Sequence, residues 1–228
     1  MGRNDSRDGM DAMDGTATEQ LSMTAAELSF LLASGERAGE TPRLLGLTDA
    51  DRTDAVLSAG LGSLLLRHLA APVDGARLEM APAVAAVAAG LHHPRGFVQV
   101  ELSADDHADG ALLIHGERSR VLVAARAYRC YDIKPIPADV DAREPLLAVA
   151  DQFLHRHRPA VATFTASSAA DVTRGVEPVR ATLSSSADGS WRVVTRDGAE
   201  TPAGDFDAAA AVLRDELARM MPVPSVPA

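Results

Sequence analysis

The sequence predicts an α+β fold in which two pseudo-symmetric β-β-β-α units build one antiparallel sheet, preceded by an N-terminal helical segment. Apolar residues follow helical spacing up to about residue 95 and then alternate, which indicates a change from helices to strands. In addition, three strand-like runs followed by an amphipathic helix occur twice, over residues 97–157 and 159–221. A chain that repeats one such order builds two related halves, so we expect a sheet-and-helix platform that binds a partner.

The N-terminal part begins with a polar stretch and continues as three helices. Residues 1–20 are rich in Asp, Gly and Met without periodicity, so we expect a disordered tail. Thr24 and Glu27 have the spacing of a capping box at the start of a first helix. A second helix is expected from residues 48–51 onward, with leucines at helical spacing through Leu69, and a third opens with Pro82.

The two units follow in the same order. The first has expected strands over 97–102, 111–115 and 121–128, a linker containing Pro135 and Pro137, and a helix over 143–157. The second has expected strands over 160–165, 179–184 and 191–195 and a helix over 206–221. We therefore predict a single domain over 21–221, divided into a helical segment (21–95), a first unit (96–158) and a second unit (159–221). A flexible, proline-rich tail is expected over 222–228.

Composition excludes several classes of function. Asp and Glu (32) outnumber Lys and Arg (22), and the net charge of -10 argues against nucleic acid and anionic membranes as partners. Cys130 is the single cysteine, so no intrachain disulfide forms. The first residues lack the apolar core of a signal peptide, and no apolar stretch approaches the roughly 20 residues of a membrane span. These features predict a cytoplasmic protein without membrane insertion.

The sequence contains no recognised arrangement of catalytic, cofactor-binding or metal-ligating residues. His155 and His157 lie two positions apart in a predicted helix and point in different directions, so they cannot share one ion. No Gly-x-Ser-x-Gly elbow and no phosphate-binding Gly-Lys-Ser/Thr loop is present. We therefore expect no cofactor, no metal and no catalytic residue, although the histidines leave a hydrolase or metal enzyme as a less favoured hypothesis.

Aromatic and large apolar residues at the end of the third strand are candidates for partner binding. Tyr128, Tyr131, Ile133 and Ile136 run from that strand into the proline linker, and Trp191 lies on the last hairpin. Exposed aromatics at the margin of a sheet anchor partner proteins. The alternative is that these side chains fill the core and cover the sheet edge, which for a lone tryptophan is the commoner role.

The order of these signals resembles the EspG family of chaperones, which serve type VII (ESX) secretion in actinobacteria. The resemblance is carried by the early helix over 23–32, the Leu-Gly-Leu run at 45–47, the helix over 59–69 and the helix that opens with Pro82. It continues through the two meanders, the second of which ends in Gly-Ser-Trp-Arg-Val-Val at 189–194, to the C-terminal helix.

The resemblance implies a cytosolic, quasi-two-fold α+β protein that binds the helical tip of a secretion substrate. One face of the sheet and the C-terminal helices would form the binding surface, which adds Leu213 and Leu217 to the candidates. We thus expect a non-enzymatic chaperone for an apolar helical segment of a PE/PPE-like or WXG-like partner. A homodimeric regulatory or scaffold protein, in which the paired units form the dimer interface, is the alternative.

Overall fold

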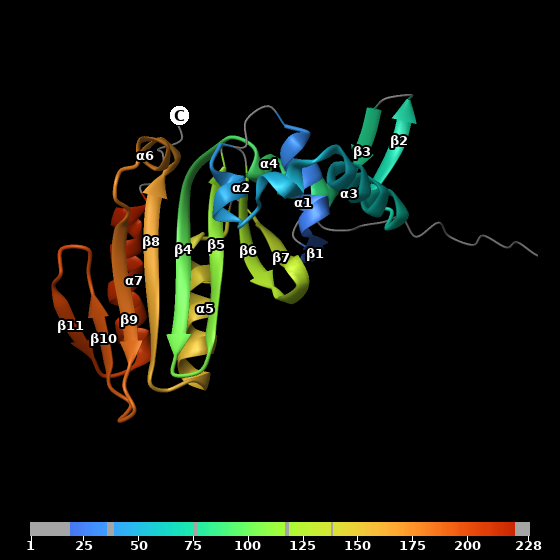
Figure 1. The fold of residues 1–228 in the computed structure, drawn as a ribbon. Coiled ribbons are helices and arrows are strands. Elements are labelled where there is room, and N and C mark those ends of the chain that lie inside the picture. Colours follow the sequence, from blue (N-terminus) through green and yellow to red (C-terminus); the bar gives the residue numbers. More distant parts are fainter. Residues whose placement is uncertain (1–18, 36–38, 75–76, 117–118, 138, 222–228) are drawn as a thin grey trace, which may run out of the picture.

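A large antiparallel sheet organises the chain (Figure 1). The computed structural model describes residues 19–35, 39–74, 77–116, 119–137 and 139–221. Residues 1–18 of the predicted N-terminal tail and all of the predicted tail over 222–228 lie outside the described residues. The sheet has nine strands in the order β1-β7-β6-β5-β4-β8-β9-β10-β11, and every neighbouring pair is antiparallel. The predicted α+β class is therefore confirmed.

The two units meet at the centre of the sheet, where β4 pairs with β8. The first unit consists of β4 (Pro94–Ala104), β5 (Ala108–Gly116), β6 (Arg120–Arg126), β7 (Cys130–Ile136) and α5 (Arg143–Arg156). The second consists of β8 (Ala160–Ser168), α6 (Ala169–Arg174), β9 (Val179–Ser185), β10 (Trp191–Val194), β11 (Glu200–Ala203) and α7 (Phe206–Met220).

Each unit therefore has a fourth strand that the sequence prediction missed. The predicted strand over 121–128 stops at Arg126, because Tyr128 and Arg129 adopt positive φ angles of 59° and 58° and turn the chain back. The expected linker then forms β7, which tolerates Pro135 because β1 pairs only with residues 130–133 and leaves the rest of β7 at the sheet edge. The edge strand β11 holds Pro202 for the same reason.

The N-terminal segment was predicted to be helical throughout, but the structure contains strands there as well as helices. Its helices are α1 (Ala25–Ala33), α2 (Thr41–Leu44), α3 (Asp54–Leu66) and α4 (Pro82–Leu91), with a 3-10 turn η1 (Asp49–Arg52) before α3. Its strands are β1 (Leu21–Thr24), which extends the sheet, and the hairpin β2 (Ala70–Asp74) and β3 (Arg77–Met80), which projects from the body (Figure 1). The structure contains the predicted capping box, in which Thr24 and Glu27 bond reciprocally. No helix in the described part of the chain has the length and apolar character needed to cross a membrane.

The two faces of the sheet belong to two separate cores. Because side chains alternate along a strand, Val98, Val100 and Leu102 of β4 pack against α5 and α7 on one face. The opposite face packs against the N-terminal helices through a second cluster, which includes Phe97, Leu112, Ile114, Val121, Val123 and Ile133. Figure 1 shows α5 and α7 behind the sheet and α2 in front of it.

The second face is covered unevenly, and this asymmetry creates the candidate site. Its positions on β5, β6 and β7 are apolar and buried beneath the N-terminal segment. The equivalent positions of the second unit are mostly polar, and Arg180 of β9 and Arg192 of β10 are exposed. On β4, at the boundary, Gln99 and Glu101 are exposed as well. The N-terminal layer therefore ends beside β4 and leaves a step on the sheet surface.

Candidate partner-binding surface

A groove follows β4 at this step. It consists of two hollows of ≈ 400 Å³ and ≈ 350 Å³, which are both lined by Leu44, Gln99 and Leu112. The sheet register places Leu112, Gln99 and Thr165 side by side on neighbouring strands, with Glu101 and Thr163 in the next row. The floor therefore combines apolar side chains, uncharged polar side chains and the carboxylate of Glu101 along the middle of the sheet.

Two helices from different halves of the chain form the walls. On one side, Leu44 and Leu45 stand at the end of α2, which opens with Pro42 near its N-terminus. On the other, Val172 of α6 and Val176, in the loop that leads to β9, line the smaller hollow. The loop begins where Gly175 takes a positive φ of 67° and ends α6, a conformation that favours glycine. The groove thus exists because both short helices stop beside β4.

The α2 wall is fixed to the sheet by a buried hydrogen bond. The Tyr131 hydroxyl on β7 donates to the Leu45 carbonyl oxygen at 2.8 Å. Burial raises the pKa of the Tyr131 hydroxyl, which keeps the donor protonated. Tyr131, one of the predicted partner-binding residues, is 5% exposed and lines the larger hollow from below. Its role in the structure is therefore to hold the wall of the groove.

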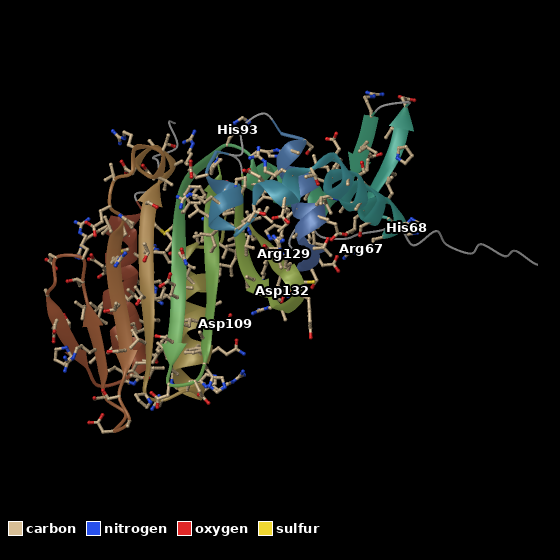
Figure 2. The ribbon with its side chains drawn as sticks, in the orientation of Figure 1. Arg67, His68, His93, Asp109, Arg129 and Asp132 are labelled. Carbon is tan, nitrogen blue, oxygen red and sulfur yellow. The ribbon has the colours of Figure 1, made fainter. Side chains whose placement is uncertain are left out.

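An ion pair attaches the next turn of the N-terminal segment to the β6–β7 hairpin. Arg129 donates to the Asp51 carboxylate of η1 at 2.7 Å, and the Thr48 backbone N–H donates to the same oxygen at 2.7 Å. The hydrogen bond from Arg129, followed by that from Thr48, lowers the pKa of Asp51 from 3.8 to about 2. Figure 2 shows Arg129 beside the N-terminal helices. The ion pair with Asp51 thus stabilises the left-handed backbone conformation of Arg129.

A buried carboxylate joins α1 to α3 in the same layer. Glu27 is fully buried and accepts hydrogen bonds from the Thr24 backbone N–H at 2.7 Å, the Ser63 hydroxyl at 2.7 Å and the Arg67 guanidinium at 2.8 Å. Burial alone would raise the pKa of Glu27, but these hydrogen bonds outweigh it and hold the pKa below its usual value. Glu27 therefore links α1 to α3 within the N-terminal layer.

Most of the predicted partner-binding residues lie in the core. Besides Tyr131, five more are buried in the two apolar clusters, namely Ile133, Ile136, Trp191, Leu213 and Leu217. Trp191 stacks edge-on against Phe206, with ring centroids 5.4 Å apart, and the Arg158 guanidinium lies 4.9 Å from its ring. These five side chains have structural roles and are not exposed anchors.

Tyr128 is the predicted residue that remains at the surface. Its side chain is 96% exposed, at the tip of the β6–β7 turn, and it does not line either hollow. The structure therefore does not bring the seven predicted residues together. The groove is instead built by Leu44, Gln99, Glu101 and Leu112, which the sequence prediction did not single out. Gln99 and Glu101 alternate with buried valines on β4, a pattern that marks an outward face without showing that it is hollowed.

The histidines make local contacts, and the rings of His107 and His157 lie against each other with centroids 4.3 Å apart. His92 bonds the Leu31 carbonyl oxygen at 2.7 Å, and His155 pairs with Asp151 at 2.6 Å one helical turn away. Burial, with the nearby charges of Arg120 and Arg95, lowers the pKa of His115. In the described ranges, no group of three or more His, Cys, Asp or Glu side chains is placed to hold a metal ion.

Comparison with known proteins identifies the fold. No family model and no curated protein sequence matches the chain. Among solved structures, the chain is similar to the Mycobacterium tuberculosis type VII secretion system chaperone EspG5, in complex with the PE25–PPE41 dimer. The TM-score is 0.58 at 12% sequence identity, and the match covers 89% of this chain and 97% of that chain. The chain has an EspG-like fold. The EspG-like fold agrees with the resemblance stated from the sequence, including the α+β class and the large antiparallel sheet.

Proposed function

We propose that the chain is a non-enzymatic, cytoplasmic chaperone of type VII secretion. In this proposal it binds an apolar helical segment of a PE/PPE-like substrate in the groove between α2 and α6 before export. The observation that carries the proposal is an open groove along the central strand of an EspG-like fold, a fold shared with a chaperone that was solved with a PE–PPE dimer.

The dimensions of the groove support a helical occupant. The β4 residues that line it run from Phe97 to Glu101, which corresponds to roughly 13 Å at about 3.3 Å per residue. A helix of about 9 residues has the same length at about 1.5 Å per residue. The hollows of ≈ 400 Å³ and ≈ 350 Å³ each fall in the size range of binding sites that bury most of a ligand.

The chemistry of the groove suits an amphipathic partner. Leu44, Leu112 and Val176 supply apolar surface, whereas Gln99 and Thr165 supply hydrogen-bonding groups on the floor. An apolar helix that is exposed in the cytosol is an aggregation hazard, and its burial in such a groove removes that surface from water.

A substitution that fills the groove tests the proposal. Gln99→Trp places a large side chain on the floor, and Arg192→Trp places the same side chain on the same sheet face three strands away. Both positions are exposed, so neither change disturbs the core. Each variant is purified from the native host with an affinity tag, and the recovery of helical secretion substrates is quantified by mass spectrometry.

We expect the parent protein and the Arg192→Trp variant to recover one such substrate in stoichiometric amounts, and the Gln99→Trp variant to lose it. Equal recovery by all three proteins would place the binding surface elsewhere. A stable symmetric dimer in sedimentation, without any co-purifying partner, would favour the dimeric scaffold hypothesis instead.

A further inference from the structure

The charges of the groove indicate which helix it selects. We propose that Glu101 is a specificity-determining residue, which pairs with an arginine or lysine at one end of the bound helix. This inference rests on the proposed function and adds the partner's charge. Glu101 lies on the groove floor, has few contacts within the protein and carries the negative charge of that floor.

Glu101 lies on the open floor with few neighbours. In the sheet register it stands opposite Gly110 on β5, which has no side chain, and opposite Thr163 on β8. Its contact within the described residues is a hydrogen bond of 3.0 Å, donated by the Gln99 side-chain amide. The carboxylate is exposed and forms none of the ion pairs of the described residues, so it is available to a cation from outside.

The end of the groove at Glu101 is acidic. Among the described residues that line the larger hollow, Glu101 and Asp109 are the charged ones. The register sets Asp109 opposite Leu102, so its side chain turns to the α5 face, where Arg126 lies 3.5 Å away, and Glu101 is the carboxylate on the groove floor. Figure 2 shows Asp109 low on the sheet, away from Arg129 and the N-terminal helices.

The opposite end carries charges of both signs. The smaller hollow is lined by Arg43 and Glu177, and Arg43 pairs with Glu40 at 2.8 Å. A helix with an apolar stripe along one side and a basic residue beside Glu101 is therefore complementary to the groove.

Three synthetic peptides separate the charge preference from binding itself. Each is a stapled helix of about 14 residues with the same leucine stripe, and the residue pair in its first turn is arginine, glutamine or glutamate. Dissociation constants are measured by fluorescence anisotropy for the full-length protein and for the variants Glu101→Gln and Glu101→Lys. Glu79→Lys on the projecting hairpin is the matched control, because it makes the same change in net charge at an exposed position outside the groove.

The parent protein is expected to bind the arginine peptide about twofold to fivefold more tightly than the glutamine peptide, and the glutamate peptide most weakly. Glu101→Gln should bring the ratio of arginine to glutamine affinity close to one, Glu101→Lys should reverse the preference, and Glu79→Lys should leave it unchanged. Added salt should weaken the preference without abolishing binding.

Equal affinity of the parent protein for all three peptides would overturn the role of Glu101 and leave the groove as the docking surface. A preference that survives Glu101→Lys would overturn it as well. If none of the peptides binds the parent protein, the groove itself is not the docking surface and the charge preference falls with it.

Discussion

The ion pair between Asp51 and Arg129 gives a stability that depends on pH in a predictable direction. Asp51 is 6% exposed, and its carboxylate accepts hydrogen bonds from Arg129 and from the Thr48 backbone. We consider the change Asp51→Asn, which keeps the size of the side chain and removes its charge. Asp49→Asn is the matched control, because Asp49 lies in the same turn with its side chain fully exposed.

The magnitude follows from the pKa of Asp51. The pKa falls from 3.8 to about 2 on folding, and each pKa unit corresponds to about 1.4 kcal/mol, so the full effect is about 2 kcal/mol. The Arg129 side chain is 52% exposed, and solvent screening lowers the expected value to about 1–2 kcal/mol. Because the folded-state pKa is depressed, this stabilisation is complete above about pH 4 and disappears as the pH falls to about 2.

Urea unfolding followed by circular dichroism measures the effect. At pH 7, Asp51→Asn should lower the free energy of unfolding by about 1–2 kcal/mol, and Asp49→Asn by less than about 0.5 kcal/mol. At about pH 2.5 the difference between the parent protein and Asp51→Asn should shrink to less than half, because the parent carboxyl becomes protonated. The same loss at both pH values would refute the electrostatic explanation.

Two further predictions concern the layer that forms the α2 wall. A Cβ atom on Gly60 of α3 would lie 2.1 Å from the Ala26 carbonyl oxygen, so Gly60→Ala should force α1 and α3 apart and lower the melting temperature by several degrees. Gly62→Ala is the control, because nothing lies within 4 Å of a Cβ atom there. This change should leave the stability unchanged or raise it by up to about 1 kcal/mol. Tyr131→Phe removes the hydroxyl that donates a 2.8 Å hydrogen bond to the Leu45 carbonyl oxygen. The free energy of unfolding in urea should fall by about 1–2 kcal/mol, and substrate capture should weaken. An unchanged free energy of unfolding would show that this hydrogen bond does not hold the wall.

The sequence predicts the halves of the fold well because their signals are local. Each of these signals is visible within a short stretch of sequence. They are the alternation over β4 and β8, the capping box at Thr24 and Glu27, and the amphipathic patterns of α5 and α7. Two of the missed strands, β7 and β11, contain prolines and follow tight turns. Whether a proline-containing run is a linker or an edge strand depends on which neighbour it pairs with, and that information is not local.

The site was harder to predict for the same reason. Leu44 and Gln99 are far apart in the sequence, and neither differs in type from an ordinary surface or core residue. They share a groove because α2 and α6 both end beside β4. Conversely, the aromatic and leucine residues that stand out in the sequence do so mainly because they fill the cores, as Trp191 and Leu213 show.

The most direct test of the groove as the docking surface is site-specific photo-crosslinking in the purified complex. A benzoylphenylalanine is placed at Val176, which lines the groove and is 49% exposed, or at Val179, which is 39% exposed and does not line it. The account predicts that Val176 crosslinks efficiently to an apolar helical segment of the substrate and that Val179 does not. Crosslinks from Val179 alone, or equal yields from both positions, would contradict it.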